Sequence, residues 1–272
     1  ELKWIKMSTE DHHALTHSRI KEFESLVSKE RAESEEEGAA SIPIAPPPEL
    51  GDKVIEVNGV EKSYNGQPLL KDVSFSIPRG AIVGIVGPNG TGKTTLFRMI
   101  TQQEDPDNGS IEVGQTVELA YVDQHRDSLN GENSVFEEIS EGKNEIEFGK
   151  QVIPARSYVA RFNFKGSDQQ KQVGNLSGGE RNRVHLAKLL KEGGNVLLLD
   201  EPTNDLDVGT LRRLEESMQD FPGCALVISH DRFFLNRICT HTLAFEGDAK
   251  VRWFPGNYEE YEQKRREELA IR

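Results

Sequence analysis

Three short apolar runs constrain the fold of this chain more than any other feature. They read AIVGIVG at 81–87, NVLLLDEP at 195–202 and CALVISHD at 224–231, and helix-like sequence follows each of them. Continuous apolar runs of this length suit the strands of a parallel sheet, because helices cover both faces of such a sheet. The pattern therefore predicts an α/β fold with a doubly wound, mainly parallel core sheet.

Segments of alternating polarity predict an additional antiparallel β subdomain. We expect its first strands in VIEVNGVEKSY at 54–64 and SFSIPRG at 74–80, and we expect GSIEVG at 109–114 and VELAYVDQ at 117–124 to join them. The more polar stretch at about 125–190 has no strong strand signal. It is therefore interpreted as an inserted helical subdomain.

The N-terminal part of the chain differs from the rest. Residues 1–37 contain no proline or glycine and carry apolar residues on one helical face, whereas three consecutive prolines at 46–48 favour an extended connector. The chain starts with Glu1 in mid-pattern, so we expect it to be a piece of a longer protein. The expected divisions are a helical linker remnant at 1–37, a proline-rich connector at 38–52, a nucleotide-binding domain at 53–255 and a C-terminal helix at 256–272.

Composition narrows the possible partners and the compartment. The 272 residues have a formal net charge of −13, which argues against a broad nucleic-acid-binding face, so any RNA contact must be local. No apolar run approaches the roughly 20 residues needed to span a bilayer, and no signal peptide opens the chain. These features predict a cytoplasmic protein without a membrane partner. Cys224 and Cys239 lie in apolar stretches and are expected to be buried thiols.

A phosphate-binding loop follows the first apolar run. GPNGTGKTT at 87–95 fits the pattern G-x-x-x-x-G-K-[ST] between a predicted strand and a predicted helix. Backbone N–H groups of such a loop surround a β-phosphate, the lysine reaches the β and γ oxygens, and the hydroxyl after the lysine binds Mg²⁺. The residues predicted to hold the nucleotide here are Gly87, Pro88, Asn89, Gly90, Thr91, Gly92, Lys93, Thr94 and Thr95.

Acidic and imidazole groups end the other two apolar runs. Asp200 and Glu201 close the second run and His230 closes the third. Ligands bind at the carboxyl ends of parallel strands, so these side chains are expected to meet the phosphate loop. We interpret Asp200, with Thr94, as a Mg²⁺ ligand and Glu201 as the general base, and we place His230 on the γ-phosphate side. The predicted catalytic residues are Lys93, Glu201 and His230.

Other positions carry weaker signals for the same site. Gln124, at the end of 117–124, is a candidate for Mg²⁺ or the attacking water, and Tyr64 is a candidate for stacking on adenine from a loop after an early strand. LSGGE at 176–180 begins a helix with small residues, which indicates an anion site formed by Ser177, Gly178 and Gly179. One chain thus contains two phosphate-binding patterns.

The order of these motifs resembles that of the ATP-binding cassette (ABC) ATPases over residues 53–255. The resemblance implies ATP and Mg²⁺ as ligands, a nucleotide contact by Asp207 in NDLD, and a second cassette whose signature motif completes the site. DEPTNDLD, SHDRFFLNRI and GNYEEYEQKR resemble the ABC-F subfamily, which has two cassettes in one chain and acts on ribosomes. That subfamily implies ribosome and tRNA as partners, and residues 1–37 resemble the end of its inter-cassette linker.

Two other functions share the catalytic motifs. An ATPase subunit of a membrane transporter has the same catalytic motifs. The helical linker and the segments HDRFFLNRI and GNYEEYEQK favour instead the hypothesis of an ABC-F protein that acts on ribosomes. A non-hydrolysing ATP-gated scaffold is the other alternative, against which the intact Lys93, Glu201 and His230 speak. The cluster Lys264, Arg265 and Arg266 is a candidate RNA contact or a solvated helix face.

Overall fold

The computed structural model describes residues 41–121 and 129–270. The linker helix expected at 1–37 and the predicted ligand Gln124 lie outside the described residues.

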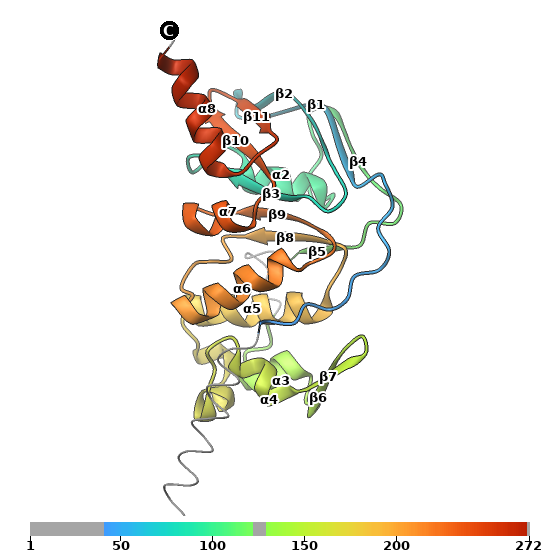
Figure 1. Cartoon of the computed structure of the whole chain (residues 1–272), viewed down its shortest axis with the longest axis vertical. Helices are drawn as coiled ribbons and strands as arrows, with labels where there is room; N and C mark the ends of the chain where they lie inside the picture. Colours follow the sequence, from blue (N-terminus) through green and yellow to red (C-terminus); the bar gives the residue numbers. More distant parts are fainter. Residues whose placement is uncertain (1–40, 122–128, 271–272) are drawn as a thin grey trace, which may run out of the picture. The chain divides into compact units, whose positions relative to one another are not determined.

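A six-stranded sheet forms the centre of the described chain (Figure 1). Its order is β11-β10-β3-β9-β8-β5, and every neighbouring pair is parallel except β10 and β11. The strands are β3 (Ile82–Val86), β5 (Leu119–Tyr121), β8 (Val196–Asp200), β9 (Cys224–Ile228), β10 (His241–Gly247) and β11 (Lys250–Phe254). The three apolar runs are the adjacent strands β3, β9 and β8, so the predicted mainly parallel core sheet is confirmed.

The expectation for residues 117–124 is wrong. Within this segment β5 does not join the antiparallel sheet but pairs in parallel with β8, with Leu119 opposite Val196 and Tyr121 opposite Leu198. Only Ala120 of the strand is buried, and its two neighbours are partly exposed. An edge strand of a parallel sheet can therefore show the alternation that we took for an antiparallel strand.

A three-stranded antiparallel sheet of order β2-β1-β4 accompanies the core sheet. It contains β1 (Ile55–Tyr64), β2 (Gln67–Ile77) and β4 (Asn108–Val113), as expected for 54–64, 74–80 and 109–114. Helix α2 (Lys93–Ile100) packs between this sheet and one face of the core sheet, and its buried side chains share one apolar cluster with both. The antiparallel sheet thus covers the helix that starts in the phosphate loop.

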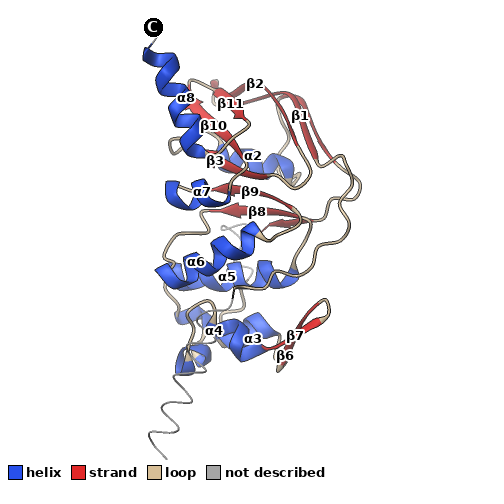
Figure 2. Cartoon of the chain, viewed as in Figure 1, coloured by secondary structure: helices blue, strands red, loops and turns tan. Residues whose placement is uncertain are grey.

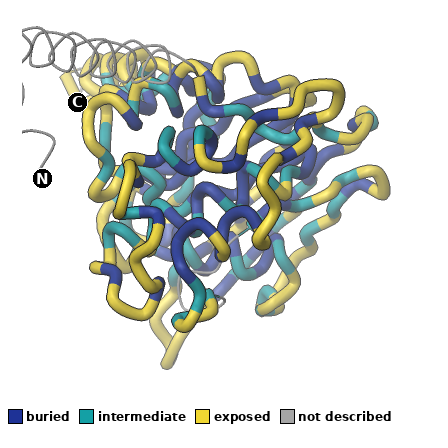
Figure 3. Tube along the Cα trace, turned by 90° about the horizontal axis from the view of Figure 1, so that it is seen from below, coloured by how far each residue is buried: buried dark blue, intermediate teal, exposed yellow. Residues whose placement is uncertain are grey.

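Helices cover the opposite face of the core sheet, as Figures 1 and 2 show for α5 (Gly178–Glu192) and α6 (Val208–Gln219). Alternation along β8 explains the two faces: Val196 and Leu198 belong to the cluster with α2, whereas Leu197 and Leu199 belong to the cluster with α5 and α6. Each such side chain contributes about 1.5–3 kcal/mol when fully buried. Figure 3 shows the buried segments gathered inside the fold and the exposed residues mainly at its periphery.

The inserted region contains a β-hairpin that the sequence did not predict. It comprises α3 (Val135–Ser140), β6 (Glu145–Phe148), β7 (Gln151–Pro154), α4 (Ala155–Ala160) and the 3-10 turns η2 (Gly166–Gln170) and η3 (Val173–Asn175). The hairpin strands have four residues each, too few for their alternation to stand out in a polar stretch.

Two helices complete the described chain after β9: α7 (Arg232–Ile238) and α8 (Tyr258–Ala270), the latter within the expected C-terminal helix. None of the helices in the described ranges is long and apolar enough to cross a membrane.

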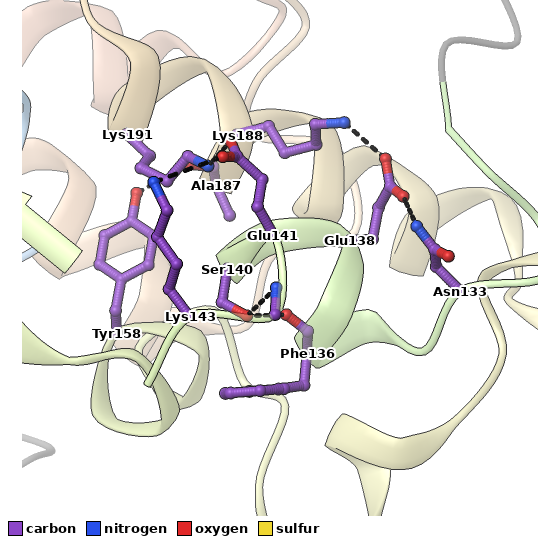
Figure 4. Close-up of polar contacts among 11 residues, drawn as sticks. Asn133, Phe136, Glu138, Ser140, Glu141, Lys143, Tyr158, Ala187, Lys188 and Lys191 are labelled. Carbon is purple, nitrogen blue, oxygen red and sulfur yellow. Dashed lines mark hydrogen bonds and ion pairs between the residues drawn. The ribbon is translucent and has the colours of Figure 1, made fainter. Parts of the chain in front are cut away.

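Polar contacts join the inserted helices to α5 (Figure 4). The nearly buried Glu138 of α3 accepts hydrogen bonds from Lys188 Nζ at 2.5 Å and from Asn133 Nδ2 at 2.8 Å. The fully buried Tyr158 of α4 donates its hydroxyl to the Ala187 carbonyl of α5 at 2.7 Å. A buried carboxylate or hydroxyl is costly without partners, so these contacts specify how α3 and α4 lie on α5.

Both cysteines are buried free thiols, as the sequence predicts. Gly80 N–H donates to Cys224 Sγ at 3.1 Å, and burial raises the pKa of Cys239 to about 12. A thiol with so high a pKa is unreactive at neutral pH.

The contact between α4 and α5 gives a stability prediction. Tyr158→Phe should lower the free energy of unfolding by about 1 kcal/mol, because it removes the buried hydrogen bond to Ala187 and leaves the ring in place. The matched control is Tyr258→Phe, which removes a hydroxyl bonded to Glu262 at the surface of α8 and should have a smaller effect. Urea denaturation followed by circular dichroism measures both, and an equal loss in the two variants would contradict the prediction.

Candidate functional site

The phosphate loop connects β3 to α2 and reverses the chain over six residues, 87–92. Gly92 precedes the helix with φ of +105°, a conformation that glycine adopts without the steric cost that a Cβ imposes. Thr91 Oγ1 donates to the Pro88 carbonyl at 2.8 Å and braces the loop from within. The first N–H groups of α2 have no carbonyl of a preceding turn to bond to, so they are available to an anion.

Lys93 is folded back into the loop. Its ammonium donates to the carbonyls of Gly87 and Pro88, both at 2.8 Å, and the residue is only 8% exposed. Burial lowers the pKa of Lys93, and the charges of Glu201 and Asp200 oppose that shift. A buried cation with only partial compensation from neighbours is a favourable partner for a phosphate oxygen.

Asp200, at the end of β8, and Thr94, at the start of α2, are hydrogen-bonded. Thr94 Oγ1 donates to Asp200 Oδ2 at 3.1 Å, although the two residues come from α2 and β8. Hydroxyl and carboxylate oxygens are the ligand type that Mg²⁺ prefers, and Mg²⁺ commonly completes its shell with water and substrate phosphate. Thr94 and Asp200 therefore fit the predicted Mg²⁺ site, whereas the third predicted ligand, Gln124, lies outside the described residues.

Glu201 has a strained backbone. Its φ is +51°, a left-handed conformation that is uncommon for a residue with a Cβ, and its N–H donates to the Ile228 carbonyl of β9 at 2.8 Å. Such strain persists where surrounding structure enforces it, and it concentrates at functional positions. Burial raises the pKa of the Glu201 carboxyl, against the opposing effects of His230 and Lys93.

His230 and Glu201 lie in contact. The ring Nε2 is 3.3 Å from Glu201 Oε1, and the His230 N–H donates to Glu201 Oε2 at 3.3 Å. The same Nε2 is 3.0 Å from Asn89 Oδ1 in the phosphate loop. Asn89 and Glu201 thus contact the same ring nitrogen and together orient the ring.

A cavity of about 750 Å³ brings the predicted groups together. Its walls include Asn89, Lys93, Thr94, Asp200 and Glu201. The carboxyl end of β8 thus delivers two carboxylates to one space, and the start of α2 delivers a cation and a hydroxyl to the same space. Such a site can hold a polyphosphate at the loop and a divalent cation between Thr94 and Asp200.

Two polar residues that we did not predict, Arg98 and Tyr121, also line this cavity, together with the apolar Leu69 and Ile228. Arg98 lies four residues after Thr94, so the helical repeat was a signal that places it on the same face of α2. Tyr121, whose ring packs edge-on against Phe97 at 5.8 Å, reaches the cavity only because β5 joins the core sheet. The wrong assignment of that strand hid it.

Tyr64 is the last residue of β1 rather than a loop residue, and it is 42% exposed. Its hydroxyl bonds to Glu104, and Lys62 Nζ lies 5.5 Å from its ring centroid. Exposure rules out plain core packing as its role. Because the Tyr64 ring is exposed near the start of α2, its stacking on adenine stays a prediction.

The LSGGE segment at residues 176–180, which we call the signature motif, forms the start of α5 and lies outside the cavity of the phosphate loop. Ser177 is the N-cap and forms a capping box with Glu180, while Gly178 has open space beside it. None of Ser177, Gly178 and Gly179 is among the described residues that line the cavity of the phosphate loop. The anion site predicted for these residues is therefore separate from that cavity within the described chain.

Asp207 serves as a helix cap. Its Oδ1 accepts from the N–H groups of Gly209 and Thr210 at 3.0 Å each, and its Oδ2 accepts from Thr210 Oγ1 at 2.7 Å. A Cβ on Gly179 would collide with Asp205 in the same loop. The capping residue Asp207 thus fixes a loop that packs on the signature motif, and its contact with a nucleotide stays a prediction.

Comparison with known proteins identifies relatives along the whole chain. The family model described as "ABC transporter" matches residues 70–204. The "Energy-dependent translational throttle protein EttA" of Escherichia coli (strain K12) is 55% identical over 99% of this chain and 48% of its own length. The protein of the same name in Mycobacterium tuberculosis (strain H37Rv) is 49% identical over 100% of this chain and 49% of its own. This chain spans about half the length of these curated relatives.

Solved structures share the fold at lower identity. A bacterial Atm1-family ABC exporter with ATP bound superposes with a TM-score of 0.63, 22% identity and coverage of 82% of this chain and 42% of its own. A dimeric ATP-binding cassette in a post-hydrolysis state, bound to ADP and Pi, gives a TM-score of 0.57, 18% identity and coverage of 75% and 100%. At these identities the likeness concerns the fold alone.

The raised pKa of Glu201 predicts a pH-dependent gain of stability on its removal. A carboxyl whose pKa is higher in the folded than in the unfolded state destabilises the fold progressively as pH rises above 4.5, its ordinary value. Glu201→Gln should therefore be more stable than the wild type at pH 7, and the difference should vanish near pH 4. Urea denaturation with EDTA and without nucleotide measures it, with the exposed Glu216→Gln as control. If Glu201→Gln were less stable than the wild type at pH 7, the raised pKa of Glu201 would be refuted.

Proposed function

Because this chain belongs to the ATP-binding cassette ATPases, and within them to the ABC-F subfamily, we propose that it binds ATP at residues 87–95 and hydrolyses it with Glu201 as general base. The observation that carries the proposal is the placement of Glu201 in one cavity with Lys93, Thr94 and Asp200, in contact with His230. We propose residues 53–255 as the nucleotide-binding domain, with residues 1–37 and 38–52 as linker and connector and 256–272 as a C-terminal helix.

Each side chain has a defined task in this mechanism. Lys93 leaves the loop carbonyls to bind β and γ oxygens, and the loop N–H groups surround the β-phosphate. Thr94 and Asp200 would hold Mg²⁺, which would supply positive charge to the phosphate oxygens. Glu201 accepts a proton from the attacking water, a task that its raised pKa favours. His230, whose ring Asn89 and Glu201 orient, lies on the γ-phosphate side in this mechanism.

The site requires a second cassette. Ser177, Gly178 and Gly179 lie apart from the cavity of the phosphate loop, and they offer a helix N-terminus to an anion. We propose that they bind the γ-phosphate held by another cassette, which is either another part of a longer chain or a second copy of this one. A single copy is then expected to bind ATP and to hydrolyse it poorly.

The name of the relatives supports a role in translation for the longer protein. Proteins named energy-dependent translational throttle align over 99–100% of this chain. We propose that the ATP state of the cassettes sets how a cytoplasmic protein engages the ribosome and tRNA, as nucleotide-driven changes do in other switches. Ribosome binding with ATP but not ADP in a sedimentation assay on the longer protein tests this step.

The catalytic assignment is tested by Glu201→Gln in a protein with paired cassettes. Turnover should fall by about 10²-fold or more, because the base is removed, while ATP affinity should stay within a factor of two. Phosphate release and equilibrium nucleotide binding are the two measurements. Glu216→Gln, an exposed change of the same kind on α6, serves as the control and should keep full turnover. Ordinary turnover in Glu201→Gln would eliminate this residue as the base.

A further inference from the structure

The connector at residues 41–50 is anchored in the fold near both of its ends. Ile42 is 1% exposed and belongs to the apolar cluster of α5 and α6, whereas Leu50 is 4% exposed and belongs to the cluster of α2 and β1. Figure 1 shows the blue segment passing beside α5 before it rises to β1. A chain held in two separate cores is not a free spacer, and we call its first part, residues 41–48, the strap.

The strap caps the C-terminal end of α5. Ala45 N–H donates to the Leu190 carbonyl at 2.9 Å. The last four carbonyls of an α-helix have no partner within the helix, so this bond satisfies a group that otherwise needs water or another cap. The approach is close: a Cβ on Gly193, the C-cap residue, would lie 2.6 Å from Ala45 Cβ. Glycine at position 193 therefore lets the strap reach the helix end.

The strap also contacts the inserted region. Arg161, at the end of α4, donates from Nη1 to the Ser41 carbonyl at 2.6 Å. Pro46 lies beside the turn of the β6–β7 hairpin, where a Cβ on Gly149 would be 2.9 Å from Pro46 Cγ. One short segment thus bonds to α4 and α5 and packs on the hairpin.

Helix α5 links the strap to the signature motif. The helix has 15 residues, so its length is about 22 Å. Ser177 caps one end and the strap caps the other. Glu138 and Glu141 hold the C-terminal part of the helix through Lys188 and Lys191, at 2.5 Å in both pairs. A packed helix restrained in this way transmits a displacement of one end to the other.

We propose that the strap positions the signature motif: by capping α5 it sets where Ser177 lies, and so couples the chain before Ser41 to closure of the composite ATP site. The capping of α5 follows from the contacts of Ala45 with Leu190 and Gly193. The coupling to closure rests on the proposed function, because it needs a second cassette that presents ATP to Ser177.

Ala45→Pro is the variant that isolates the capping bond. Proline lacks the N–H donor and suits the extended conformation of a segment that already contains Pro43 and Pro46. Glu49→Pro is the matched control, since it adds proline at an exposed position of the same connector. Ala45→Gly keeps the donor and serves as the conservative variant.

Hydrogen exchange of the nucleotide-free chain is the first measurement. In Ala45→Pro, amides at 189–193 should exchange about five-fold faster, the effect of one lost hydrogen bond on local opening. Ala45→Gly and Glu49→Pro should leave them within two-fold of the wild type. Unchanged exchange in Ala45→Pro, in a chain with the wild-type circular dichroism spectrum, would overturn the capping role.

ATP-dependent pairing is the second measurement, made in the Glu201→Gln background by analytical ultracentrifugation. Ala45→Pro should weaken pairing about five-fold or more, while ATP affinity stays within two-fold because no strap residue is among the described residues that line the cavity of the phosphate loop. Undiminished pairing would overturn the coupling. Absence of pairing in both controls would instead refute a composite site formed by two copies of this chain, and the exchange result would still decide the capping role.

Discussion

The parallel ladder of β3, β9 and β8 is the constraint on which the site depends. Asp200 pairs with Ile228 across β8 and β9, and Ile85 of β3 pairs with the same Ile228. Their strands are buried on both faces, so the register cannot slip without exposing apolar side chains. The three strands therefore end together, and the segments that follow them bring His230 into contact with Glu201 and Asn89.

Loss of hydration changes the pKa values of the two ionisable groups Glu201 and Lys93 at this site. Burial raises the pKa of the Glu201 carboxyl and lowers the pKa of the Lys93 ammonium. Each shift marks a charge that the fold stabilises incompletely, because the buried loop carbonyls and neighbouring side chains replace only part of the lost hydration. A bound polyphosphate would supply the missing partner for the cation, and a water proton would supply one for the carboxylate. Ligand binding and stability thus oppose each other at the same groups.

Sequence reasoning was strongest where chemistry and periodicity agreed. Lys93, Thr94, Asp200 and Glu201 were predicted from apolar runs that end in polar groups, and the structure brings them together in one cavity. Tyr121 was missed because a three-residue edge strand has too short a pattern to reveal its sheet. The β6–β7 hairpin was missed for the same reason. Asp207 has a capping role that a motif alone does not reveal, since the cap depends on the start of α6.

The sequence by itself determined the α/β class, the phosphate loop, the acidic and imidazole groups at strand ends, and the buried state of both cysteines. These features follow from local patterns of hydrophobicity and spacing, which act within one strand or one turn. Only the tertiary structure decided that β5 joins the core sheet, that Asn89 and Glu201 orient His230, and that Ala45 caps α5. Those contacts join residues far apart in the chain, and their existence depends on how separate elements pack to satisfy buried polar groups.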